Sequence, residues 1–241
     1  MTNGTRTPVI DSCHPHAVFP AGRKPGVLPR KSRLGEWCPR ASEHIKLIPR
    51  GEWEERAADI SLRPHVHTVL DQGSVGSCAT ESTAGGIMVA RSMQGVARRE
   101  DHVVLNPWFI YQETSGGRDR GSNIDSNLAF ARKYGCASEA VWPRSKGWRA
   151  KPSEEAFADA MKYRIEEFYD IASVDEFVSA VLTGFPVVYG SAGHSVLRVE
   201  YMLDLNSWGE AWKDGGFGLW ASLNAINWGY GAFAIRVAAQ G

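Results

Sequence analysis

The sequence predicts an α+β protein of two lobes, because helix-forming patterns fill its first half and short strand-like segments fill its second. We expect residues 51–241 to form the folded domain, with a helical lobe over about 70–150 and a β-rich lobe over about 151–237. Residues 1–50 are rich in Pro, Gly, Arg and Lys and have little hydrophobic periodicity. They are expected to form an extended or partly disordered N-terminal arm.

The helical lobe contains segments with clear starts and stops. The first helix is expected to begin near Ser77 or Cys78 and to run to about Arg91. The next, over LNPWFIYQET, has Asn106 as a possible N-cap and a proline at its first position. A third, over IDSNLAFARKYG, ends at Gly135.

The second half mixes both kinds of segment. SEEAFADAMK and SVDEFVSAVLTG read as helices, and the strand-like segments are YRIEEFYDI, PVVYG, HSVLRVEYMLDL, FGLWASL and GAFAIRVA. A hairpin turning near Glu200 would pair the two ends of HSVLRVEYMLDL. That stretch has no Gly, Asn-Gly or Pro to make the turn.

Composition excludes several classes of function. Lys plus Arg and Asp plus Glu both total 27, so the formal net charge is zero and nothing favours a nucleic acid or an anionic membrane. There is no apolar stretch near 20 residues and no apolar run of signal-peptide length at the start. We therefore expect a cytoplasmic protein, or one of a virion or host cytoplasm if phage-encoded, with reduced cysteines.

A metal site has weak support in the sequence. Cys13, His16, Cys38 and His44 could in principle bind zinc, but their spacing matches no common finger. No H-E-x-x-H motif occurs either. We expect no metal and no other cofactor.

One cysteine is placed for reactivity. A free thiol has a pKa of ~8.5, and the positive end of a helix or an adjacent imidazolium lowers that value. Cys78 lies where a turn containing Gly73 and Gly76 feeds the long helix. An imidazolium would have to be brought near by folding, and of the seven histidines His194 lies in a GHSV context at the start of a strand-like segment and shortly before NSWG. Cys136, just after a helix-ending glycine, is expected to be a buried structural thiol.

Three motifs, in this order, resemble those of papain-like cysteine peptidases: QGSVGSC ending at Cys78, GHSV around His194, and NSWG from Asn206. The last continues to DGGFG, and the segments LNPWFIYQET, AFARKYG and EAVWP also resemble landmarks of that family. The resemblance covers about residues 60–237, and the chain resembles a trimmed bacterial or phage member of the family. It implies a helical lobe that carries the cysteine and a reduced antiparallel β lobe that carries the histidine and asparagine.

The resemblance implies a role for each matching residue. Cys78 would be the nucleophile that forms an acyl-enzyme, His194 its base, and Asn206 the residue that fixes the imidazole. Gln72 and the backbone N–H of Cys78 would form the oxyanion hole. Trp208 would shield the histidine–asparagine hydrogen bond from water. The partner implied is a polypeptide substrate.

Several positions depart from the family pattern. Val75 replaces a disulfide cysteine, Ala79 replaces an aromatic residue, and Lys213 replaces a common glycine. The stretch between Pro186 and Asn206 is short, so the second lobe is trimmed. The arm has no likeness to the family's inhibitory leader, but it could lie across the cleft.

Two alternatives to a peptidase remain open. Each matching residue alone has an ordinary structural reading, so a catalytically silent papain-like domain with a binding or structural role fits the same motifs. An amidase acting on cell-wall peptides ranks lower, because such enzymes usually lack NSWG. The sequence says nothing of the oligomeric state.

Overall fold

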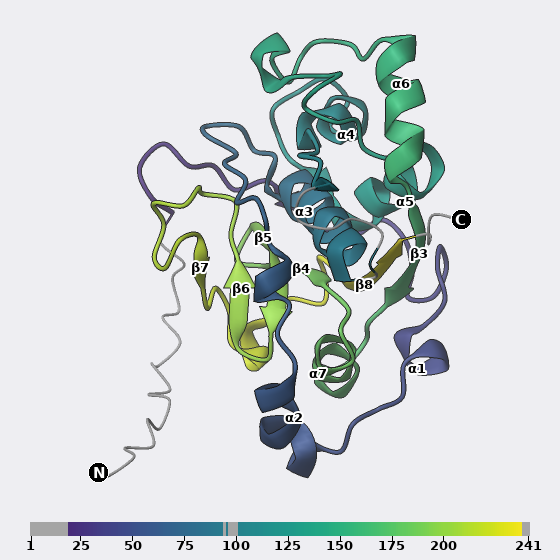
Figure 1. Ribbon diagram of the computed structural model, residues 1–241, viewed down its shortest axis with the longest axis vertical. Coiled ribbons are helices and arrows are strands. Elements are labelled where there is room, and N and C mark those ends of the chain that lie inside the picture. The colour runs from purple at the N-terminus through teal and green to yellow at the C-terminus, as the bar shows by residue number, and fades with distance from the viewer. Residues whose placement is uncertain (1–18, 94, 96–100, 238–241) are drawn as a thin grey trace.

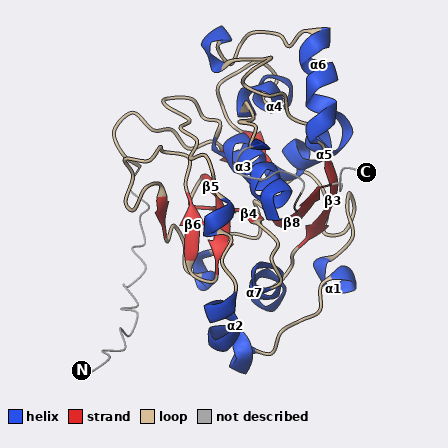
Figure 2. Ribbon diagram, in the orientation of Figure 1, coloured by secondary structure: helices blue, strands red, loops and turns tan. Residues whose placement is uncertain are grey.

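The computed structural model describes residues 19–93, 95 and 101–237, and its central element is the helix α3 (Cys78–Met93) (Figure 1). α3 lies between a group of helices at one end of the molecule and an antiparallel sheet. The other helices are α1 (Ala41–His44), α2 (Trp53–Asp59), α4 (Pro107–Thr114), α5 (Ile124–Tyr134), α6 (Glu154–Ala160) and α7 (Val174–Leu182). Figure 2 shows the strands gathered in the half of the molecule away from α4 and α6.

The sheet is antiparallel throughout and has the order β3-β8-β4-β5-β6-β7. Its strands are β3 (Ile165–Asp170), β4 (Val187–Ser191), β5 (His194–Glu200), β6 (Leu203–Leu205), β7 (Phe217–Gly218) and β8 (Ala232–Val237). A separate parallel pair joins β1 (Val27–Leu28) to β2 (Ser122–Asn123). The α+β architecture expected from the sequence is confirmed.

The helix boundaries follow the local signals. The side chain of Asn106 accepts a hydrogen bond from the backbone N–H of Trp108 at 3.0 Å, which caps α4. α5 ends before Gly135, whose φ of +83° is a left-handed conformation that glycine adopts without strain. One expected strand is shorter than its sequence pattern predicted. Of FGLWASL only the first two residues form β7, and Leu223 begins a 3₁₀ turn.

Two hairpins position the strands that matter for the site. β4 and β5 are joined by Ala192 and Gly193, which have φ of 50° and 78°, the combination of a type I′ hairpin turn. β5 and β6 are joined at Tyr201 and Met202, and the register shifts between Arg198 and Glu200. The hairpin expected near Glu200 is confirmed, although no turn-forming residue is present.

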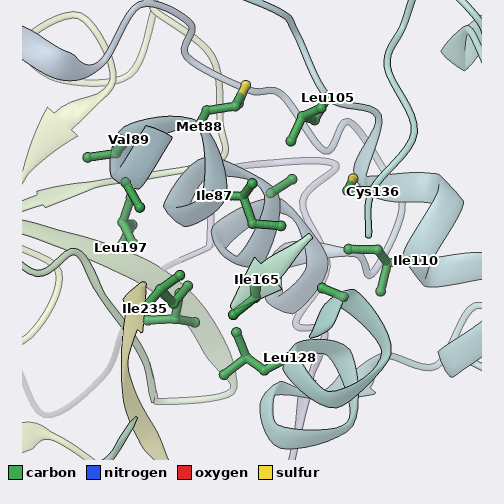
Figure 3. Packing of buried hydrophobic residues seen from close by; sticks show 14 of the residues in the cluster. Ile87, Met88, Val89, Leu105, Ile110, Leu128, Cys136, Ile165, Leu197 and Ile235 are labelled. Carbon is green, nitrogen blue, oxygen red and sulfur yellow. The ribbon is translucent and has the colours of Figure 1, made fainter. Parts of the chain in front are cut away.

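Apolar side chains cover both faces of the sheet. On one face Ile87 of α3 packs with residues from α4, α5 and the sheet, such as Ile110, Leu128 and Ile235 (Figure 3). On the other face α7 covers the sheet, and Phe177 is buried against that side. Burying both faces is the main source of stability in such layered folds.

From Val27 onward the N-terminal segment is part of the packed domain. Arg30 donates to the buried carboxylate of Asp170 at 2.5 Å, and the backbone N–H groups of Lys31 and Ser32 donate to Asp125 at 2.7 and 2.6 Å. The side chains of Val27, Cys38, Ala41 and Ile45 are buried. Residues 27–45 therefore cannot be separated from the domain without opening its core.

The zinc alternative gains no support from the described residues. Cys38 is a buried free thiol, and the ring of His44 stacks on Tyr169 at 5.0 Å between centroids. Cys13 and His16 lie outside the described part of the chain. Among the residues that are described, no three His, Cys, Asp or Glu side chains are grouped to hold a metal ion. No helix in residues 19–93 or 101–237 has the length and apolarity to cross a bilayer.

Candidate active site

The two lobes meet where Cys78 begins α3 and His194 begins β5. Both side chains are fully buried. One helical turn beyond Cys78, the hydroxyl of Ser82 shares a hydrogen bond of 2.7 Å with the hydroxyl of Ser195, which ties α3 to β5 beside the site. The type I′ turn at Ala192–Gly193 fixes His194 as the first residue of its strand.

Asn206 orients the imidazole of His194. His194 Nε2 donates to Asn206 Oδ1 at 2.8 Å, and the same oxygen accepts from the backbone N–H of Ser207 at 2.7 Å. Because Oδ1 accepts two hydrogen bonds, the ring proton is assigned to Nε2 and the lone pair to Nδ1. Nδ1 is buried and has no hydrogen-bond partner within the described residues. The ring thus keeps one basic nitrogen free on the side away from Asn206.

Aromatic rings enclose that hydrogen bond. Trp208 stacks on His194 with 4.7 Å between centroids and an interplanar angle of 27°. Trp220 meets the same imidazole edge-on at 4.9 Å. Water is kept away, which strengthens the bond between His194 and Asn206.

The Gln72 side chain is held in one orientation. Its Oε1 accepts from the hydroxyl of Ser207 at 2.9 Å and from Trp208 Nε1 at 3.2 Å. Its Nε2 must then face the other way, where it donates to the carbonyls of Val75 at 2.8 Å and Lys24 at 3.2 Å. The amide N–H group of Gln72 therefore points toward the main-chain carbonyl of Lys24, in the segment that runs across the site.

A buried charge network supports the turn before Cys78. Ser77 Oγ donates to Glu81 Oε1 at 2.9 Å, and Arg144 donates to Glu81 Oε2 at 2.5 Å. Arg144 also donates to the backbone carbonyl of Asp71 at 2.6 Å. Burial raises the pKa of Glu81, although Arg144 opposes that shift. The network links the Gln72 turn to the first turn of α3.

Residues 19–28 of the arm run across this site. The ring of Phe19 lies 5.6 Å from His194 and 5.7 Å from Trp208 between centroids. The N–H groups of Gly26 and Val27 both donate to the carbonyl of Gly193, at 3.1 and 3.3 Å. The carbonyl of Gly26 accepts from the N–H of Ser122 at 2.9 Å, so the arm crosses from one lobe to the other.

This cover leaves the thiol and the imidazole in a dry environment. Burial raises the pKa of Cys78 to about 12, against smaller lowering effects from the backbone N–H groups of Ser195 and Gly26. Burial lowers the pKa of His194 to about 4, against a smaller opposing effect of Asn206. Both shifts favour the uncharged form, so at neutral pH the covered site holds a neutral thiol and a neutral imidazole.

Hydrogen bonds and ring stacking join four of the residues proposed for the site, Gln72, His194, Asn206 and Trp208, and Cys78 lies against the backbone of Ser195, the neighbour of His194. Sequence reasoning missed Phe19, Trp220 and Ser207. An isolated aromatic in the arm and a tryptophan in a strand-like run carry no signal of their own. Ser207 belongs to the NSWG motif and could have been found there. Cys136 is buried, as expected, and its thiol points to the carbonyl of Asn106 at 3.4 Å.

Comparison with solved structures gives the fold a context. Xylellain, a cysteine protease from Xylella fastidiosa, aligns with a TM-score of 0.65 and 19% identity over 90% of this chain and 98% of its own. Digestive procathepsin L 3 of Tenebrio molitor aligns at 0.60 and 19% over 74% of this chain and 69% of its own. Bromelain from Ananas comosus aligns at 0.58 and 15% over 74% of this chain and 98% of its own.

No model of a protein family and no curated protein matches the sequence. The likeness is therefore structural. The chain has the fold of the papain-like cysteine proteases, as its sequence motifs predicted.

Proposed function

We propose that the protein is a papain-like cysteine peptidase that hydrolyses peptide bonds through Cys78, His194 and Asn206. The observation that carries the proposal is the hydrogen bond from His194 Nε2 to Asn206 Oδ1, which leaves a buried Nδ1 lone pair that no residue in the described part of the chain engages. A fixed base beside a helix-starting cysteine is the arrangement that nucleophilic catalysis requires.

The chemistry follows from the assigned protons. His194 Nδ1 takes the proton of the Cys78 thiol, and the thiolate attacks the substrate carbonyl carbon. The oxyanion accepts from Gln72 Nε2 and from the N–H of Cys78, which as the first residue of α3 has no intrahelical acceptor. His194 then returns its proton to the leaving amine, and water hydrolyses the resulting thioester. Removing the Gln72 donor is expected to lower kcat by roughly 10²–10³-fold.

The arm keeps this site closed in the full chain. A Cβ on Gly26 would lie 2.1 Å from the carbonyl oxygen of Gly76, so Gly26→Ala prevents the arm from seating. A Cβ on Gly51 would meet no atom within 4 Å, which makes Gly51→Ala a matched control. We expect Gly26→Ala to raise the reactivity of Cys78 at least about tenfold, the factor for a shift of about 1.4 kcal/mol toward the open arm.

The test combines labelling with hydrolysis. The full chain, Gly26→Ala and Gly51→Ala are treated at neutral pH with an epoxysuccinyl thiol-protease inhibitor, and the adducts are mapped by mass spectrometry. Fast labelling of Cys78 in Gly26→Ala, lost with His194→Ala, and casein hydrolysis lost with Cys78→Ala would support the peptidase. If Cys78 labels no faster than Cys38 in the open variant, the silent binding domain becomes the better interpretation. Hydrolysis of purified cell wall without casein hydrolysis would favour the amidase.

A further inference from the structure

Two adjacent basic side chains of the arm reach two different carboxylates beside Cys78. Arg23 forms a two-pronged ion pair with Asp71, with one contact between Nη2 and Oδ2 of 3.0 Å. The same guanidinium donates to the carbonyls of Gly73 at 3.2 Å and Trp208 at 3.1 Å. Its side chain is only 18% exposed.

The second carboxylate belongs to the loop after α4. Lys24 Nζ donates to Asp119 Oδ2 at 2.9 Å. The other oxygen, Oδ1, accepts from the N–H of Gly76 at 2.7 Å and from the hydroxyl of Tyr111 at 3.0 Å. Asp119 is therefore held by the protein with one oxygen left for a cation.

The backbone between these side chains lies at the reactive centre. The carbonyl of Lys24 accepts from Gln72 Nε2, the donor that we assign to the oxyanion hole. The arm thus places a peptide carbonyl and two basic side chains in the cleft at once. One basic group lies on the side of Trp208 and the other on the side of the loop that carries Asp119.

An ordinary surface ion pair would not indicate a binding site, because exposed pairs contribute little to stability and do not select one partner. The Asp71 position differs because a guanidinium there meets a carboxylate and two carbonyls that match its fork of donors. Arg144, the other cation that lowers the pKa of Asp71, uses its own donors on Glu81, Glu139 and the backbone carbonyl of Asp71. The Asp71 carboxylate therefore remains available to a basic side chain bound in the cleft.

The ionised state of both carboxylates fits this role. The hydrogen bond from Arg23 is the main cause of a lowered pKa at Asp71. At Asp119 burial acts to raise the pKa, but hydrogen bonds from Lys24, Gly76 and Tyr111 outweigh it, and the pKa is lowered. Both groups are therefore negatively charged at neutral pH.

We propose that Asp71 and Asp119 form two acidic subsites that bind basic side chains of peptides entering the cleft, and that Arg23 and Lys24 occupy them in this structure. The substrate class is then polypeptides with neighbouring Arg or Lys residues at the reacting bond. This inference rests on the proposed peptidase function and specifies its substrate. It also explains why the arm fits the cleft, since the arm carries the side chains that the subsites accept.

The test uses the full chain with Arg23→Gln and Lys24→Gln, which empties both subsites without altering them. The probes are acetyl-Ala-Gly-Arg-Lys-amide and the matched acetyl-Ala-Gly-Gln-Gln-amide. Each is titrated against the rate at which iodoacetamide labels Cys78, followed by mass spectrometry. We expect the basic probe to protect Cys78 with an apparent Kd at least about tenfold lower than that of the neutral probe.

Substitutions in the subsites identify the cause of the preference. Asp71→Asn and Asp119→Asn, each added to this background, should weaken protection by the basic probe and so reduce the preference for it. Asparagine keeps an oxygen for the N–H of Gly73 or Gly76, so the local turns retain their acceptors. Equal protection by both probes, or a preference unaffected by either substitution, overturns the proposal.

Failure of the two proposals can be told apart. If the basic probe binds preferentially but no variant hydrolyses any peptide, the peptidase function fails and the subsites stand. If peptides are hydrolysed without regard to basic residues, and Asp71→Asn and Asp119→Asn leave that cleavage pattern unchanged, the function stands and the subsites fail.

Discussion

Arg198 replaces the missing turn residue of the β5–β6 hairpin, and substituting it tests that explanation. Its guanidinium donates to Asp204 at 2.6 Å, to Tyr189, and to the carbonyls of Tyr201 and Ala221 at 2.8 Å each. Both members of the ion pair with Asp204 are fully buried. The hairpin that brings His194 and Asn206 together is therefore held from inside by one side chain.

Arg198→Met is expected to lower the free energy of unfolding by about 3 kcal/mol. Breaking a buried ion pair typically costs about 3–5 kcal/mol, because one charge is left without its partner. Asp204 would keep two neutral donors, the Tyr189 hydroxyl at 3.0 Å and the Trp220 N–H at 2.8 Å, so the lower end of that range applies. Total stabilities of about 5–15 kcal/mol make this a large loss.

The assay is urea unfolding followed by tryptophan fluorescence, with the slope m compared between variants. Arg198→Met/Asp204→Asn removes the unpaired charge while keeping an acceptor for Tyr189, so it should recover most of the loss. Arg236→Met, which breaks only half-exposed pairs with Glu166 and Glu167, should cost less than about 1 kcal/mol. A loss below about 1 kcal/mol for Arg198→Met, or no recovery in the double variant, would refute the explanation.

Two further predictions concern strain and pH. Lys213 has a φ of 44°, so Lys213→Gly should raise the free energy of unfolding by about 1 kcal/mol in urea titrations, whereas Lys213→Ala should not. The pKa of His194, about 4, lies below its unfolded value. The contribution of the neutral ring to the free energy of unfolding is therefore complete above about pH 6.5 and is lost as the pH falls toward 4. The loss over that range is roughly 3 kcal/mol. The variant His194→Gln should not show this loss when its unfolding is measured over the same pH range.

The elements that sequence reasoning located share a local cause. The N-cap at Asn106, the stop at Gly135 and the Gly-rich turn before Cys78 each act over a few residues, so their patterns can be read from the chain. The order of the cysteine, histidine and asparagine motifs predicted the papain-like arrangement of these elements. Local signals and motif order together predicted the fold. The motifs also named Cys78, His194 and Asn206 as candidate site residues, but they gave no sign of Phe19 or Trp220 beside the imidazole.

Features set by distant contacts could not be read in this way. The hairpin at Tyr201–Met202 depends on a buried ion pair between strands, and the pairing of Asp71 and Asp119 with the arm depends on where the arm lies. The arm itself was expected from composition to be an extended or partly disordered segment. Its Pro- and Arg-rich sequence does not show that the N–H of Gly26 meets a carbonyl from the other lobe.

The position of the arm also bears on the electrostatics of the site. A thiolate–imidazolium pair needs solvation or close mutual contact, and burial, to which Phe19 and Gly26 of the arm contribute, instead shifts the pKa values of Cys78 and His194 toward their neutral forms. Seating the arm and ionising the pair therefore oppose each other. By thermodynamic linkage, whatever favours the ion pair weakens the arm, and whatever displaces the arm favours the ion pair. A peptide that competes for Asp71 and Asp119 would accordingly expose the nucleophile and favour its reactive form in one step.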